Sequence, residues 1–199
     1  MTIKTFTPIQ LWKDFDDSLY NESINITEYK NLDDYTAIKL YFNAINRSDG
    51  PVRVFVKLYL PTGGKNLPTV LLIPDIVNYN ADSELIKMAL LGYCTATFDY
   101  SGCGLDGHTN YPESLFYGNA KEAHDHIDTA NHGANKTSPY LWSKIARKVI
   151  TLLCSLPYVD ESKIALTSVN FGVNMLMQVA SMDKRIKCAV SIFNNGSSM

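Results

Sequence analysis

Residues 163–172 read Lys-Ile-Ala-Leu-Thr-Ser-Val-Asn-Phe-Gly and contain the pattern that decides the fold class. A short apolar run leads to Asn170, one of the few non-glycine residues that accept a positive φ. Gly172 follows two positions later, and an amphipathic segment begins directly after it. This order predicts a strand over 164–168, a sharp turn, and a helix over 173–182.

The segments that precede this turn alternate between strand and helix patterns. Residues 37–45 and 52–60 carry hydrophobic side chains at every second position on either side of a Ser-Asp-Gly-Pro sequence, which predicts an antiparallel hairpin. Residues 69–73 are continuously apolar, as expected for a strand that helices cover on both faces. The same reasoning predicts helices over 82–91 and 138–156 and strands over 93–99 and 186–193.

The predicted helix over 82–91 has recognisable ends. Asp82 or Ser83 is expected to cap its N-terminus, and Gly92 is expected to end it. Four side chains at helical spacing are expected to form its inner face: Leu85, Ile86, Ala89 and Leu90.

One folded domain is expected to account for most of the 199 residues. Residues 1–34 are polar and aromatic without a clear period, and they are interpreted as a loop-rich extension with one short helix near 9–20. Residues 35–199 alternate strands with helices after the opening hairpin. This alternation predicts an α/β domain whose sheet is mostly parallel and is covered by helices on both faces. Residues 110–137 form the longest polar segment that does not follow the alternation of strands and helices.

The composition excludes several classes of function. Hydrophobic residues make up 46% of the chain and charged residues 19%, as in ordinary folded proteins. The formal net charge of −2 argues against nucleic acid or an anionic membrane surface as a partner. No apolar run approaches the roughly 20 residues that span a bilayer. Residues 1–14 lack the apolar core of a secretion signal, and the four cysteines are scattered, so the expected location is cytoplasmic.

Three segments together resemble a known family: Asp-Tyr-Ser-Gly-Cys-Gly at 99–104, Leu-Pro-Tyr-Val-Asp-Glu-Ser-Lys-Ile at 156–164, and the turn at 163–172. With the order of the elements, they resemble the α/β-hydrolase superfamily, in the branch of acetyl xylan esterases, dienelactone hydrolases and prolyl-oligopeptidase-like enzymes. The resemblance runs from about residue 37 to residue 193. In that family the fold continues through further strands that carry an acid and a histidine. The resemblance therefore implies a truncated fold whose C-terminal strands are missing.

The resemblance also implies a candidate catalytic site in which the nucleophile is replaced. The family's Gly-x-Ser-x-Gly elbow is here Ser-Val-Asn-Phe-Gly, so Asn170 occupies the nucleophile position. An amide cannot become an attacking oxyanion as an activated serine does. Backbone N–H groups of Ile76 and Phe171 take the oxyanion-hole positions. The Asp75 carboxylate beside Ile76 is expected to oppose a developing negative charge.

Other residues are candidates for chemistry, and each also has a structural interpretation. Ser168 is a candidate displaced nucleophile, although small residues at a strand end more often permit close packing. Five side chains in one polar region are candidate zinc ligands, but their spacing fits known ligand patterns only loosely: His108, His124, His126, Asp128 and His132. More often, such residues in polar loops only face solvent.

A glycine-rich segment at 102–107 superficially suggests a dinucleotide-binding loop. No helix with an apolar stripe opens directly after it, and a tight turn is the better interpretation. Cys103 within this segment has no cationic neighbour to lower the pKa of its thiol, so a structural role is expected. The sequence therefore predicts no metal and no cofactor.

Two functions follow as hypotheses. In the first, the chain is a degenerate hydrolase-like domain without intrinsic hydrolytic activity that serves binding, assembly or regulation. In the second, it is a carboxylic ester hydrolase of the acetyl xylan esterase type, or a peptidase, whose remaining catalytic residues lie beyond residue 199. The expected ligand is a small-molecule ester or a peptide. Strand 186–193 is expected to form an open sheet edge, which predicts a homo-oligomer through that strand or its coverage by residues 1–34.

Overall fold

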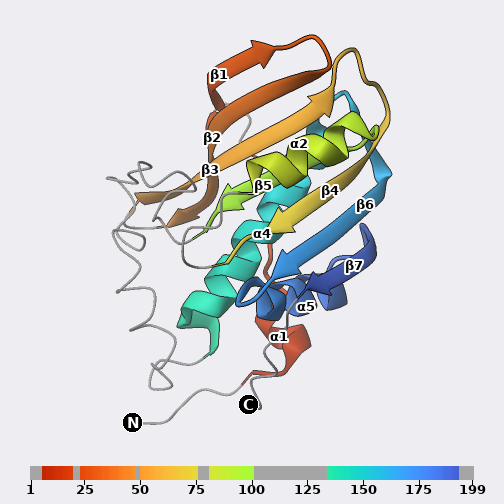
Figure 1. The fold of residues 1–199 in the computed structure, drawn as a ribbon. Helices are drawn as coiled ribbons and strands as arrows, with labels where there is room; N and C mark the ends of the chain where they lie inside the picture. The colour runs from red at the N-terminus through yellow and green to blue at the C-terminus, as the bar shows by residue number, and fades with distance from the viewer. Residues whose placement is uncertain (1–5, 20–22, 48–49, 76–80, 101–133, 193–199) are drawn as a thin grey trace.

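A mixed sheet with helices on both faces runs through the protein (Figure 1). The computed structural model describes residues 6–19, 23–47, 50–75, 81–100 and 134–192. The strands are β1 (Asn25–Asn31), β2 (Tyr35–Arg47), β3 (Gly50–Pro61), β4 (Leu67–Ile73), β5 (Cys94–Asp99), β6 (Val159–Val169) and β7 (Ile186–Ile192). The helices are α1 (Pro8–Trp12), α2 (Asp82–Leu90), the 3₁₀ turn η3 (Ala134–Lys136), α4 (Ser138–Ser155) and α5 (Gly172–Met182).

The described strands form one seven-stranded sheet in the order β1-β2-β3-β5-β4-β6-β7. The strands β1, β2, β3 and β5 pair antiparallel, and the predicted hairpin is formed by β2 and β3. The strands β5, β4, β6 and β7 pair in parallel. In the sheet, β4 lies between β5, which is the next strand along the chain, and β6, which is the strand after that. The carboxyl end of β4 therefore lies at a reversal of strand order, where open α/β sheets form their ligand sites.

The structure contains a strand that the sequence pattern did not reveal. Residues 25–31, assigned to a loop-rich extension, form β1 and pair antiparallel with β2 at one sheet edge. Almost all of β1 is exposed, so its sequence does not show the apolar alternation that identified β2 and β3. The short helix expected near 9–20 is α1, which begins earlier, at Pro8, behind a capping box of Thr7 and Gln10. The division of the chain at residue 34 stays a prediction.

Two hydrophobic layers flank the sheet. The larger layer lies between the sheet and the helices α4 and α5, and its fully buried side chains include Phe42, Phe98 and Trp142. The smaller layer lies under α2 and is formed by Tyr59, Leu72, Ala81, Leu85 and Ala89. The predicted α/β class with an N-terminal antiparallel hairpin and helices on both faces is thus confirmed. The described sheet is mixed and not mostly parallel, because three pairs of neighbouring strands are antiparallel and three are parallel. None of the described helices combines the length and hydrophobicity that a bilayer span requires.

The N-terminus of α2 differs from its prediction. Ala81 occupies the N-cap position, and no side chain caps the helix. Asp82 instead binds the buried ammonium of Lys57 on β3, with 3.2 Å between Nζ and Oδ2. Leu90 was expected on the inner face but is 52% exposed, whereas Gly92 ends the helix with φ of 97° as predicted. Asp82 therefore neutralises the buried Lys57 ammonium. The sequence of α2 alone cannot indicate this role, because Lys57 belongs to a distant strand.

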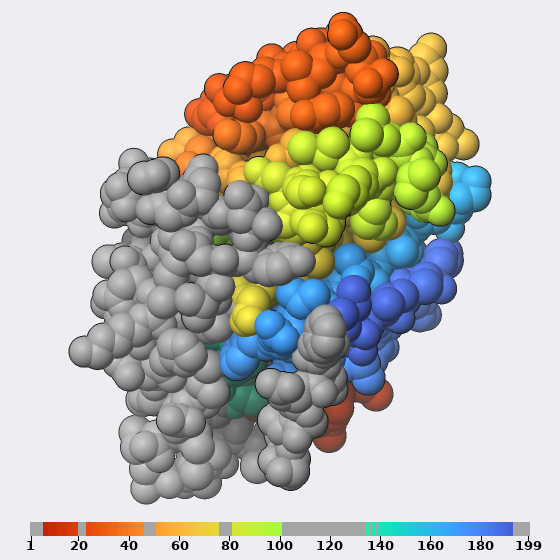
Figure 2. Space-filling view, in the orientation of Figure 1, coloured from red at the N-terminus to blue at the C-terminus, as the bar shows by residue number. Residues whose placement is uncertain are grey.

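The strand β7 forms the other edge of the described sheet. It pairs with β6, and all of its residues after Ile186 are exposed, with Val190 at 49% and Ile192 at 43%. Figure 2 shows this strand at the surface beside β6. Within the described part of residues 1–34, β1 lies at the opposite edge of the sheet.

Candidate functional site

The turn between β6 and α5 is as sharp as its sequence predicts. Asn170 adopts a positive φ of 47°. Its backbone N–H donates to the Ile192 carbonyl at 3.3 Å, and its own carbonyl accepts from the Val173 N–H at 3.2 Å. Because β6 lies between the parallel strands β4 and β7, Asn170 stands at the carboxyl end of an interior parallel strand. Its side chain is exposed there.

Gly172 brings the first turn of α5 against the end of β4. A Cβ atom at this position would lie 2.7 Å from the Ile73 carbonyl oxygen and 2.8 Å from the Pro74 carbonyl oxygen. Both obstacles are backbone atoms, so neither can rotate away as a side chain can. Only glycine therefore allows the turn at 170 to approach the segment that follows β4.

This close approach places an amide beside a carboxylate. The Asn170 Nδ2 group donates to Asp75 Oδ2 at 3.1 Å, across 95 positions of sequence. The Tyr100 hydroxyl donates to the Pro74 carbonyl at 2.9 Å and so fixes the backbone immediately before Asp75. Tyr100 is only 1% exposed, which makes this anchor rigid. Asn170, the residue predicted at the nucleophile position, thus donates to a carboxylate from the neighbouring strand end.

A row of aromatic rings connects the turn to the hydrophobic core. The Phe171 ring meets Trp142 of α4 at 6.0 Å between ring centroids, and Trp142 in turn meets Tyr100 at 5.3 Å. Tyr100 continues the row to Phe98 of β5 at 5.9 Å. Rings at these separations and tilts attract one another beyond the effect of burial alone. The row therefore couples both sides of the Asp75–Asn170 contact to the core.

The other predicted site residues are not all brought to this turn. Phe171 lies there and is half-buried, whereas Ile76 lies outside the described residues. Ser168 is fully buried at the end of β6, and within the described part of the chain its Oγ has no hydrogen-bond partner. A hydroxyl without exposure and without a base cannot attack a substrate, so the displaced-nucleophile interpretation is not supported.

Most of the other candidates cannot be placed. The five possible zinc ligands, the glycine-rich segment at 102–107 and Cys103 lie outside the described residues. Among the residues that are described, no group of three or more His, Cys, Asp or Glu side chains is arranged to hold a metal. Burial raises the pKa of the Cys94 thiol to about 12, which leaves it protonated and unreactive at neutral pH. The absence of a metal and of a cofactor stays a prediction.

Sequence comparisons point to a hydrolase family over the last part of the chain. Residues 147–199 match the model of the family described as BAAT / Acyl-CoA thioester hydrolase C terminal, and this stretch contains β6, the turn at Asn170 and α5. Among curated proteins, no sequence matches the chain.

Solved structures resemble the fold over nearly all of the chain. The acetyl xylan esterase from Paenibacillus sp. R4 has a TM-score of 0.66 and 18% identity over 95% of this chain and 60% of its own. Acetyl Xylan Esterase 1 from Thermoanaerobacterium sp. JW/SL YS485 has a TM-score of 0.68 and 15% identity over 95% of this chain and 58% of its own. A dienelactone hydrolase-like promiscuous phosphotriesterase from metagenomic libraries has a TM-score of 0.56 and 21% identity over 81% of this chain and 60% of its own.

These comparisons define the class of protein. The chain has an α/β-hydrolase-like fold, and the family-model match supports a relationship to the α/β-hydrolase superfamily. The chain spans 58 to 60% of the length of the three structures named above.

Proposed function

We propose that this chain is a degenerate α/β-hydrolase-like domain that binds a ligand or partner and does not hydrolyse esters. The hydrogen bond from Asn170 Nδ2 to Asp75 Oδ2, at 3.1 Å, carries the proposal. A carboxamide supplies no attacking oxygen, and here its nitrogen already donates to a carboxylate. Asn170 is thus part of a built contact and itself supplies no nucleophile at the turn.

The charge of Asp75 supports the same conclusion. Acyl transfer builds negative charge on the substrate oxygen, and hydrolases stabilise it with donors such as backbone N–H groups. Two negative charges about 4 Å apart repel each other by about 4 kcal/mol at an effective dielectric constant of 20. A carboxylate held against the turn by Asn170 therefore opposes the transition state that the fold otherwise favours.

The alternative function is a carboxylic ester hydrolase or a peptidase. It is favoured by the two acetyl xylan esterases among the structural neighbours and by the thioester hydrolase family that matches residues 147–199. This function requires an attacking group other than the Asn170 amide, because an amide does not attack an ester. Among the described residues at the turn, no exposed and activated nucleophile is found.

Ester hydrolysis distinguishes the two functions. We expect the native chain to hydrolyse p-nitrophenyl acetate and p-nitrophenyl butyrate no faster than a heat-denatured sample, and Asn170→Ala to behave identically. Asn174→Ala is the matched control, because Asn174 is an exposed asparagine one turn further along α5. Turnover by the native chain that Asn170→Ala abolishes and Asn174→Ala preserves would refute the proposal. Activity gained only by Asn170→Ser would identify the chain as a hydrolase that has lost its nucleophile.

Self-association through β7 is the second part of the proposal. An exposed edge strand presents backbone N–H and C=O groups that pair readily with another strand. We expect sedimentation velocity to show a dimer at micromolar concentration and Val190→Lys to shift it to monomer, because a charge in the contact carries a desolvation penalty. Met177→Lys, on an exposed position of α5, serves as the control. A native chain that sediments as a monomer at all concentrations would exclude this interface.

A further inference from the structure

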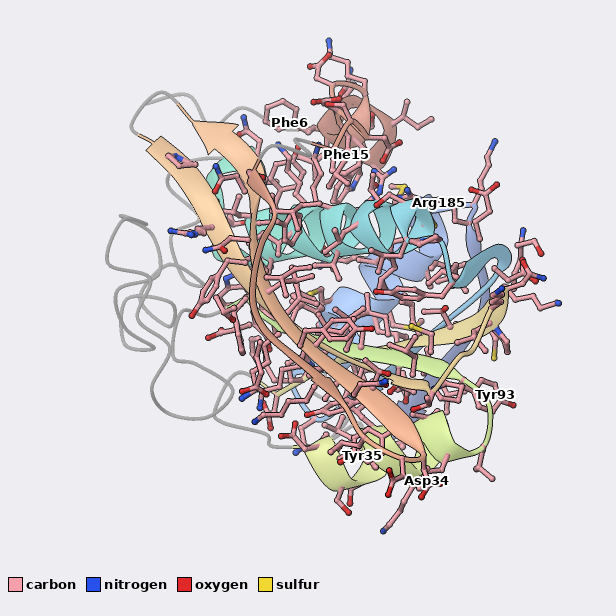
Figure 3. All side chains as sticks on the ribbon, turned by 90° about the horizontal axis from the view of Figure 1, so that it is seen from above. Phe6, Phe15, Asp34, Tyr35, Tyr93 and Arg185 are labelled. Atoms are coloured by element: carbon pink, nitrogen blue, oxygen red, sulfur yellow. The ribbon has the colours of Figure 1, made fainter. Side chains whose placement is uncertain are left out.

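Two hollows lie where α1 meets the N-terminal part of α4. One hollow has a volume of about 430 Å³ and the other about 360 Å³. Phe6, Leu11 and Tyr140 line both, so the two adjoin. Figure 3 shows Phe6 and Phe15 beside α1 and over α4. We call the two hollows together the α1 trough; their volumes fall within the range of about 300–1,000 Å³ that is typical of small-molecule sites.

The α1 trough is a fixed part of the structure because residues 11–15 anchor the N-terminal segment to α4. The Tyr140 hydroxyl donates to the Leu11 carbonyl at 2.8 Å, and the Trp12 and Tyr140 rings meet at 5.0 Å. The Arg147 guanidinium lies 3.8 Å from the centre of the Phe15 ring. However, α1 buries none of its residues. The helix is therefore held to α4 through Leu11 and Trp12 at its C-terminal end, and the two hollows remain beside it.

One end of the trough is cationic. Lys144, Lys13 and Gln10 line the larger hollow together with Asp14. Asp14 lies 4.0 Å from Lys13. The half-buried ammonium of Lys144 sits 5.5 Å from the centre of the Tyr140 ring, and within the described residues no carboxylate lies within ion-pair distance of it. Burial, followed by the charge of Lys148, lowers the pKa of Lys144. A partly desolvated cation without an ion pair is best stabilised by an anionic ligand.

The other end is mainly apolar. The smaller hollow is lined chiefly by the side chains of Pro8, Leu11, Trp12, Pro139 and Met182. Gln178 is also present, but its Oε1 accepts from the Ser143 hydroxyl at 2.8 Å. An unbranched hydrocarbon chain entering this hollow gains the free energy of leaving water and displaces no built polar contact.

We propose that the α1 trough binds an amphipathic anion of the fatty-acid type, with its carboxylate at Lys144 and its acyl chain along Trp12 and Met182. Charge complementarity selects this ligand over a neutral or cationic amphiphile, because the described lining contains two lysines, Lys13 and Lys144, but only one carboxylate, Asp14, which lies 4.0 Å from Lys13. The site is separate from the turn at Asn170. Neither hollow is lined by Asp75, Asn170 or Phe171.

Dodecanoate below its micellar concentration is the probe. Trp12 lines the trough, and the sequence contains only one other tryptophan, Trp142, which is 1% exposed. We expect a saturable change in tryptophan fluorescence that Trp12→Phe removes. Lys144→Met keeps the aliphatic stem but removes the charge, so it should weaken binding about tenfold, as expected for a lost charged hydrogen bond. Lys87→Met, on an exposed position of α2, should leave the affinity unchanged.

The apolar half of the site is tested independently. Met182→Asp puts a charge into the smaller hollow and should weaken dodecanoate binding at least as much as Lys144→Met does. Met177→Asp, on the exposed face of α5, should not weaken it. Isothermal titration calorimetry gives the affinities without reliance on tryptophan. Absence of saturable binding by the native chain would overturn the proposal. So would an unchanged affinity of Lys144→Met, or equal binding of dodecyltrimethylammonium, whose head group is cationic.

Discussion

Replacing Asp183 by alanine should lower the free energy of unfolding by about 3 to 4 kcal/mol, because it removes the buried carboxylate that Arg147 and Arg185 share. The Asp183 side chain is 3% exposed and accepts from Arg185 Nη2 at 2.5 Å and from Arg147 Nε at 3.4 Å. Its backbone N–H also ends α5 by donating to the Val179 carbonyl. Arg185 reaches on to Asp17 at 3.5 Å, so the same network ties the N-terminal segment to α5. Urea denaturation measures the effect.

Asp14→Ala is the matched control for this prediction. Asp14 is 86% exposed and contacts only Lys13, at 4.0 Å, among its described ion pairs. An exposed pair of this kind contributes about 0 to 1 kcal/mol. If Asp183→Ala were no more destabilising than Asp14→Ala, the Arg147–Asp183–Arg185 network would not be a source of stability.

The same carboxylate gives a pH dependence with a defined sign. Burial alone would raise the pKa of Asp183, but the hydrogen bonds from Arg185 and the charges of Arg185 and Arg147 outweigh it and hold the pKa below its usual value of 3.8. The contribution of Asp183 to stability is therefore fully present above pH 4 and is lost as the pH falls through the lowered pKa. We expect native stability to decline in this acid range and Asp183→Ala to show a shallower decline. Equal slopes for the two proteins would contradict the assignment.

Gly172→Ala should destabilise the protein by about 3 kcal/mol, because the added methyl group meets two backbone oxygens at less than 3 Å. The direction of the change in the free energy of unfolding is informative, because alanine normally stabilises a helix relative to glycine by about 1 kcal/mol. Thermal and urea unfolding both measure it. Gly92→Ala separates the clash from backbone strain, because Gly92 has a φ of 97° but open space around its Cβ position. We expect Gly92→Ala to lower stability by about 1 to 2 kcal/mol, through strain alone.

A Gly172→Ala variant as stable as the native chain would show that α5 does not press against the end of β4. The contact between Asn170 and Asp75 depends on that approach. Such a result would therefore also weaken the proposed explanation for the substitution at 170.

Local patterns in the sequence were sufficient to predict most of the sheet. β2 buries every second side chain, and Val or Leu stands at every second position of β3 from Val52 to Leu60, although residues 54–60 are all buried. β4 is buried almost throughout, so all three sequence patterns were clear. The turn at Asn170 could be predicted because few residues accept a positive φ and because a helical pattern follows Gly172 directly. β1 lies exposed at the sheet edge, so no hydrophobic alternation identified it.

Contacts between distant residues could not be predicted in the same way. Asp82 was expected to cap its own helix but pairs with Lys57, 25 positions earlier. The bond between Asn170 and Asp75 spans 95 positions. The local sequence around each of these residues does not indicate its partner, and only the sheet order brings the partners together. The position of Lys144 beneath α1 depends likewise on where the N-terminal segment folds back onto α4.

The proposed absence of an attacking group is tested most directly by covalent trapping. An alkyl fluorophosphonate loses fluoride and phosphonylates an activated serine, and intact-mass spectrometry counts the adducts. The native chain and Asn170→Ala should both keep their unmodified masses after prolonged incubation. A stoichiometric adduct on the folded native chain, absent after heat denaturation, would demonstrate an activated nucleophile and contradict the proposal that this hydrolase-like fold has lost its chemistry.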